Sequence, residues 1–152
     1  TLFKKSIQFK IKSNKMRYFA FIILIFLFAS CDKKIIDNLG SDLPLNKEFV
    51  IENGSTKNNL EENISLQMVS VANDSRCPSD VECVWEGDAE VNLVFNSALG
   101  IHPIILHTNL ASKDTTIGTF TISLIKLDPY PISTKVISQS EYKATIFVTK
   151  HD

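Results

Sequence analysis

Apolar and polar residues alternate along much of the chain after residue 46, which is the period of a β-strand with one buried face. The clearest case is residues 89–96, where one face carries only apolar residues: Ala89, Val91, Leu93 and Phe95. Similar patterns, bounded by turn-forming residues, predict strands over residues 47–52, 64–72, 101–108, 118–127 and 142–149. Pro103 has no backbone N–H to donate, so the strand over residues 101–108 is expected at a sheet edge.

No stretch after residue 29 has the spacing of an amphipathic helix, although residues 58–63 are compatible with a short turn. The pattern therefore predicts an all-β domain of six or seven strands. Two antiparallel sheets packed face to face would bury the alternating apolar faces, so we expect a β-sandwich, Ig-like in its general architecture. A small β-barrel is the alternative.

The N-terminal region has the layout of a secretory signal. Met16 and Arg17 precede an apolar run of 12 residues from Tyr18 to Ala29. As a helix this run would extend roughly 18 Å, whereas the hydrocarbon core of a bilayer is about 30 Å thick. A signal peptide is therefore expected rather than a transmembrane helix.

The segment Phe28-Ala29-Ser30-Cys31 resembles the lipobox of bacterial lipoproteins, although Phe28 stands where Leu is usual. The resemblance implies that Cys31 is acylated and becomes the first residue of the mature protein. It also implies an envelope protein whose partner is the membrane, through the lipid on Cys31; we expect the outer membrane of a Gram-negative bacterium. The alternative is an ordinary signal peptide followed by a chance cysteine.

These features divide the chain into four expected parts. Residues 1–15 are expected to be an upstream extension of the reading frame, because Met16 is the better start. Residues 16–30 are the signal peptide, and residues 31–46, which lack periodicity, are a lipidated tether. Residues 47–152 form the single β-sandwich domain.

Charge is distributed unevenly along the chain. Six of the 16 basic residues lie in residues 1–31, which contain no acid, so the remainder carries ten bases against all 17 acids. The resulting net charge of about −7 would repel phosphate groups, so we expect no nucleic-acid partner.

Residues 74–91 are the most distinctive part of the mature chain. Once Cys31 is assigned to the lipid, Cys77 and Cys83 remain as a pair, and the oxidising envelope favours a disulfide between them. Pro78 and the polar residues after it favour a turn between the two cysteines. Closing so short a loop stabilises a fold by roughly 2 kcal/mol.

The segment D-S-R-C-P-x4-C-V-W-x-G-x-A, beginning at Asp74, resembles a recurrent segment of small uncharacterised bacterial lipoproteins and secreted proteins. Residues 127–131 and 141–144 also look like features of that family. The resemblance covers most of the mature domain, but it implies no particular activity.

Four residues of this segment form a candidate binding surface: Arg76, Trp85, Glu86 and Asp88. Arg76 is expected to pair with Glu86, with Asp88 or with a carboxylate of a ligand. Trp85 is expected to pack over the disulfide or against the end of the sandwich. Gly87 is expected to adopt a backbone conformation that other residues avoid.

The sequence contains none of the common motifs of serine hydrolases, zinc proteases, P-loop nucleotide-binding proteins or dinucleotide-binding enzymes. Six acids lie within residues 74–90, but without the spacing of a calcium loop, and His102 and His107 are expected on opposite faces of a strand. We therefore expect no catalytic residues, no metal and no cofactor. The favoured function is a binding or accessory module of the cell envelope with a protein partner; the alternatives are a structural envelope protein and a secreted inhibitor.

Overall fold

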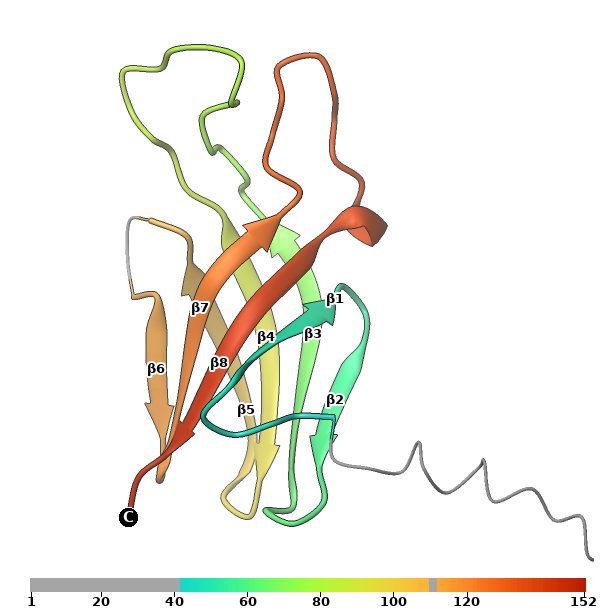
Figure 1. Cartoon of the computed structure of the whole chain (residues 1–152), viewed down its shortest axis with the longest axis vertical. Helices are drawn as coiled ribbons and strands as arrows, with labels where there is room; N and C mark the ends of the chain where they lie inside the picture. The colour runs from blue at the N-terminus through green and yellow to red at the C-terminus, as the bar shows by residue number, and fades with distance from the viewer. Residues whose placement is uncertain (1–41, 110–111) are drawn as a thin grey trace, which may run out of the picture. The chain divides into compact units, whose positions relative to one another are not determined.

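The computed structural model describes residues 42–109 and 112–152, which form two four-stranded antiparallel sheets (Figure 1). One sheet has the order β1-β8-β7-β6, with strands Glu48–Glu52, Lys143–Lys150, Phe120–Asp128 and Asp114–Ile117. The other has the order β2-β3-β4-β5, with strands Thr56–Asn59, Ile64–Ala72, Glu90–Ser97 and Gly100–His107. The two sheets stay separate and form no closed barrel, so the predicted β-sandwich is confirmed and the barrel alternative is not adopted.

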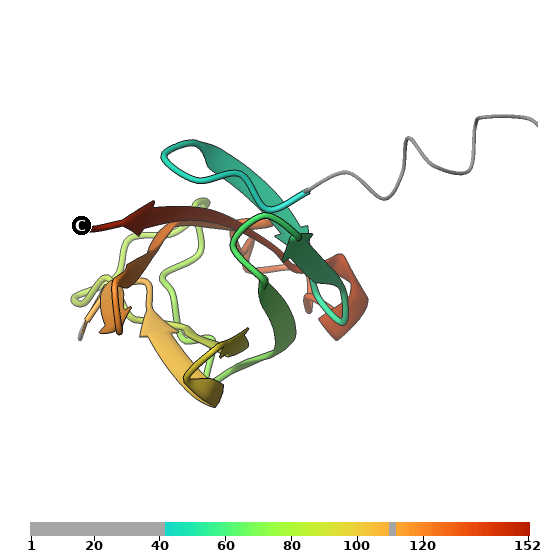
Figure 2. The same ribbon diagram turned by 90° about the horizontal axis from the view of Figure 1, so that it is seen from below.

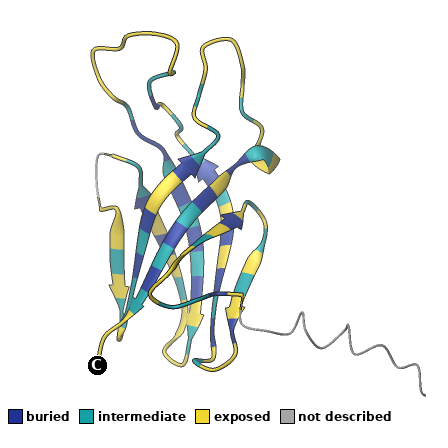
Figure 3. Cartoon of the chain, viewed as in Figure 1, coloured by how far each residue is buried: buried dark blue, intermediate teal, exposed yellow. Residues whose placement is uncertain are grey.

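The core lies between the sheets, where the predicted apolar faces meet (Figures 2 and 3). On β4, Val91, Leu93 and Phe95 are buried, and Asn92 and Val94 between them are half-buried on the other face. Phe95 also contacts Phe120 of the opposite sheet, with ring centroids 5.7 Å apart. Each fully buried side chain of this kind contributes about 1.5–3 kcal/mol.

Most predicted strands are present, and β3 has the predicted bounds, Ile64–Ala72. Pro103 lies on β5, which is an edge strand as predicted. The prediction missed β2 and β6, which have four residues each. Both strands are mostly polar and pair with longer ones, so they carry too few apolar residues to show a pattern. The last two residues of β2, Asn58 and Asn59, overlap the predicted turn over residues 58–63.

The domain begins earlier than the predicted boundary at residue 47. Leu43 is completely buried, and its backbone N–H donates to the Asn58 carbonyl at 2.9 Å. The buried Asn59 side chain donates to the Leu43 carbonyl at 3.0 Å. Residues 42–46 are therefore part of the sandwich and not of a tether; the sequence concealed this because a single buried leucine produces no periodicity.

The segments predicted as an extension, a signal peptide and the start of the tether, including Cys31, lie outside the described residues. Residues 42–109 and 112–152 contain no helix that could serve as a membrane span.

Two long loops rise from one end of the sandwich (Figure 1). The disulfide loop, residues 73–89, joins β3 to β4, and the proline loop, residues 129–142, joins β7 to β8. At the other end the β2–β3, β4–β5 and β6–β7 connections are tight turns. We call the end with the two long loops the loop end; because loops on a rigid scaffold commonly carry binding residues, it is the first place to look for a site.

Candidate functional site

The two arms of the disulfide loop pair closely at its base. The Ser75 N–H donates to the Asp88 carbonyl at 2.7 Å, and the Cys77 N–H donates to the Glu86 carbonyl at 2.8 Å. Gly87 lies between these pairs with φ +69°, as predicted. A Cβ at this position would lie 1.9 Å from the Ser75 carbonyl oxygen, so glycine is required for the close approach of the arms.

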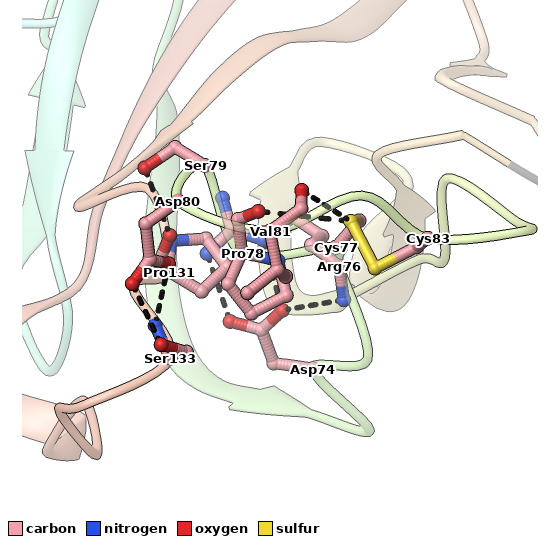
Figure 4. Close-up of a disulfide and its surroundings, with 10 residues drawn as sticks. All are labelled: Asp74, Arg76, Cys77, Pro78, Ser79, Asp80, Val81, Cys83, Pro131 and Ser133. Atoms are coloured by element: carbon pink, nitrogen blue, oxygen red, sulfur yellow. Dashed lines mark hydrogen bonds and ion pairs between the residues drawn. A yellow bond between two sulfur atoms is a disulfide. The ribbon is translucent and has the colours of Figure 1, made fainter.

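The outer part of the loop is closed by the predicted disulfide between Cys77 and Cys83, whose Cα atoms are 5.9 Å apart (Figure 4). Between the cysteines, the Val81 N–H donates to the Pro78 carbonyl at 3.3 Å, which makes the predicted turn. The disulfide thus restricts the segment that leads directly to Val84 and Trp85.

Arg76 fastens the disulfide loop to the proline loop. Its Nε and Nη2 donate to the two carboxylate oxygens of Asp74, at 2.9 and 2.8 Å. Nη1 donates to the Leu127 carbonyl at 2.7 Å, and Nη2 donates to the Pro129 carbonyl at 3.0 Å. The guanidinium also lies 5.3 Å from the ring centroid of Tyr130, within cation–π distance.

Asp74 completes this network by accepting a hydrogen bond from the Tyr142 hydroxyl at 2.8 Å. Burial alone would raise the pKa of Asp74, but hydrogen bonds from Arg76 and Tyr142 and the guanidinium charge lower it overall. Burial, together with the hydrogen bond to Asp74 and its negative charge, raises the pKa of Tyr142 to about 12. At neutral pH the network therefore holds a charged Asp74–Arg76 pair and a neutral phenol.

Two of the four residues predicted as a binding surface are interior residues. Arg76 is 7% exposed and Asp88 is 6% exposed, and the partner of Arg76 is Asp74 rather than Glu86 or Asp88. Asp88 lies instead 2.6 Å from His107 Nδ1, and accepts hydrogen bonds from the Thr108 hydroxyl and the Asn109 N–H. The spacing Asp-x-Arg could have indicated the pairing of Asp74 with Arg76, because residues two apart on an extended segment have side chains on the same side.

A second set of contacts joins the outer parts of the two loops. The Ser79 N–H donates to the Pro131 carbonyl at 2.9 Å, and Asp80 accepts from the Ser133 N–H and hydroxyl at 2.8 and 2.6 Å (Figure 4). These hydrogen bonds from Ser133 lower the pKa of Asp80. The residue pairs are more than 50 positions apart in sequence, so the predicted strands gave no indication of them.

The proline loop is also held at its other end. The Gln139 side chain accepts from the Val71 N–H at 3.0 Å and donates to the Val71 carbonyl at 2.7 Å. This pairing ties the loop to β3 of the opposite sheet. Both loops are therefore fixed to the sandwich as well as to each other.

The prediction that Trp85 packs over the disulfide or against the sandwich is wrong, because its side chain is 81% exposed. Its neighbour Val84 is 89% exposed. On the proline loop, Tyr130, Ile132 and Val136 are also exposed, at 53%, 41% and 93%. Of the predicted surface residues, Trp85 and Glu86 remain accessible, and Val84 is a third that the prediction omitted.

Beside the disulfide loop lies a polar cavity of about 370 Å³, whose lining includes Glu86, Asn109, Lys113 and Tyr130. The Asn109 side chain donates to Glu86 at 2.8 Å across this lining. Among the described residues, no three His, Cys, Asp or Glu side chains are grouped so that they could hold a metal ion. The accessible part of the loop end offers the apolar side chains of Val84 and Trp85 beside a polar cavity that contains Glu86 and Lys113.

Comparison of the chain with models of protein families, with curated proteins and with solved structures finds no match.

Proposed function

We propose that this chain is a lipid-anchored lipoprotein of the bacterial cell envelope, and that its β-sandwich is a binding or accessory module. The proposed contact surface is the exposed tip of the disulfide loop, Val84 and Trp85, with Glu86 beside it. The single observation that carries the proposal is an exposed tryptophan on a loop that is held at its base by Arg76 and farther out by the disulfide and by Asp80.

The bracing matters because binding through a mobile loop loses free energy to the ordering of that loop. Here the disulfide, the Arg76 contacts and the Asp80–Ser133 contacts already fix the conformation. Covering a tryptophan removes about 200 Å² from water, which corresponds to roughly 5 kcal/mol before the costs of association. Tryptophan is also among the residues that contribute most to protein interfaces.

The alternative role of a structural envelope protein would use the same bracing only to stabilise the fold. Val84 and Trp85 favour a binding role, because neither side chain is needed to cover the core. The two roles therefore predict different results when the tip alone is changed.

The test is in-cell crosslinking of a tagged full-length chain carrying Trp85→Ala, with Leu60→Ala as the matched control. Leu60 is 60% exposed and lies in the β2–β3 turn at the opposite end of the sandwich. We expect a partner that is captured by the unchanged chain and by Leu60→Ala, and lost with Trp85→Ala at an unchanged melting temperature. Equal capture by all three proteins would exclude Trp85 from the contact surface, and capture of no partner by the unchanged chain would favour the structural role.

The proposed anchor needs a separate test. The intact mass of the protein made in its own host should show a mature chain that begins at Cys31 and carries lipid. Cys31→Ser should remove the lipid mass and release the protein from membranes. A mature chain that starts before Cys31, or that carries no lipid, contradicts the anchor without affecting the tip.

A further inference from the structure

We infer that the partner of the loop end is a protein with an apolar pocket bordered by Lys and Arg side chains, and that Trp85 enters this pocket. The inference rests on the proposed function and specifies the chemistry of the partner. Its evidence is the charge around the tip, the fixed shape of the tip and the place where the chain enters the domain.

The charge around the tip is mainly negative, although Lys113 lines the cavity beside Glu86. Between Cys77 and Gly87 the chain carries Asp80, Glu82 and Glu86, all exposed, and no basic residue. On the proline loop, Lys135 is paired with Glu141, so it does not neutralise these acids. An interface that buries Val84 and Trp85 brings these carboxylates to its rim, where a like charge costs several kcal/mol and an opposite charge speeds association.

The shape of the tip points to a concave partner surface. Val84 and Trp85 project from the outer end of a loop whose base is fixed by two backbone pairs and by Arg76. A protein whose interface backbone is fixed in this way changes its backbone conformation little on binding. A projecting indole is covered most completely by a pocket, and apolar pockets with a few polar groups are the common form of binding sites in proteins.

A membrane surface fits this tip less well. Tryptophan is common at the interface of a bilayer, but the anionic lipids of bacterial envelopes would repel the three carboxylates. In addition, Asp42 lies beside the end of β2, toward the end of the sandwich away from the two loops (Figure 1). The described chain therefore begins at the end of the sandwich opposite the exposed tip.

The test places a photo-reactive amino acid at Val84 of the full-length chain in its own host. The variant Glu82→Gln with Glu86→Gln removes two charges, while glutamine keeps an acceptor for Asn109. The matched control, Glu48→Gln with Glu61→Gln, removes two exposed charges elsewhere. We expect adducts whose partner peptide borders Lys or Arg residues, with capture about tenfold lower for the tip variant and unchanged for the control.

Capture that is equal for the tip variant and the control would overturn the basic rim but leave the proposed binding module standing. Failure to obtain any adduct at position 84 would remove the proposed function as well. Binding of Trp85 to a membrane surface instead of a protein pocket is tested by mixing purified protein with vesicles of phosphatidylcholine and phosphatidylglycerol. Binding to these vesicles that depends on Trp85 would replace the protein pocket with a lipid surface.

Discussion

The Arg76→Met variant tests the central bracing of the loop end. Arg76 and Asp74 have side chains that are only 5% and 13% exposed, and removing the guanidinium leaves a largely buried carboxylate without its ion-pair partner. Breaking a buried pair in this way costs about 3–5 kcal/mol. Methionine retains much of the apolar stem of arginine, so lost packing contributes little to the loss in free energy of unfolding.

We expect the melting temperature to fall by about 12–20 °C, since 1 kcal/mol corresponds to about 4 °C in a domain of this size. Urea denaturation followed by circular dichroism measures the free energy directly. The double variant Asp74→Asn with Arg76→Met should recover part of the loss, because it removes the stranded charge. A loss below about 1 kcal/mol for Arg76→Met would refute the reasoning.

The same variant predicts a pH dependence. The pKa of Asp74 is lower in the folded protein than in the unfolded chain. The stabilisation by the charged carboxylate is therefore complete above the ordinary carboxyl pKa of about 3.9. It is lost as the pH falls through the lower pKa of the folded protein. The difference in stability between the unchanged chain and Arg76→Met should therefore shrink below about pH 4. A difference that is constant from pH 7 to pH 2 would show that the ion pair is not its source.

Two further predictions concern single positions in and beside the loops. Gly87→Ala should lower the free energy of unfolding by more than about 2 kcal/mol, because the added Cβ would meet the Ser75 carbonyl. The control Gly54→Ala, at φ +80° in open space, should cost about 1 kcal/mol. Equal losses of the two variants in thermal denaturation would contradict the close approach of the loop arms at Gly87. Glu141, hydrogen-bonded by Lys135 and Ser138, has a pKa of about 2, so its contribution to stability is present above the ordinary carboxyl pKa and lost as the pH falls through about 2. NMR titration should show this pKa rising in Lys135→Gln; an unchanged value would rule out the lysine as its main cause.

The fold class followed from local pattern. A strand with one buried face must alternate, so Val91, Leu93 and Phe95 indicated β4 and its inward face without knowledge of any partner strand. Pro103 indicated an edge because its missing N–H is a property of the residue itself. The disulfide could also be predicted from the sequence, because only Cys77 and Cys83 remained as a pair once Cys31 was assigned to the lipid.

The site depended on contacts that no local pattern contains. Arg76 reaches carbonyls of residues 127 and 129, and Asp80 reaches Ser133, because the sheets bring two distant connections to the same end of the sandwich. The sequence determined that the domain is a sandwich with a disulfide-closed loop. Only the tertiary structure decided that Arg76 and Asp88 are interior residues and that Trp85 faces water, because burial depends on which distant segments pack over a side chain.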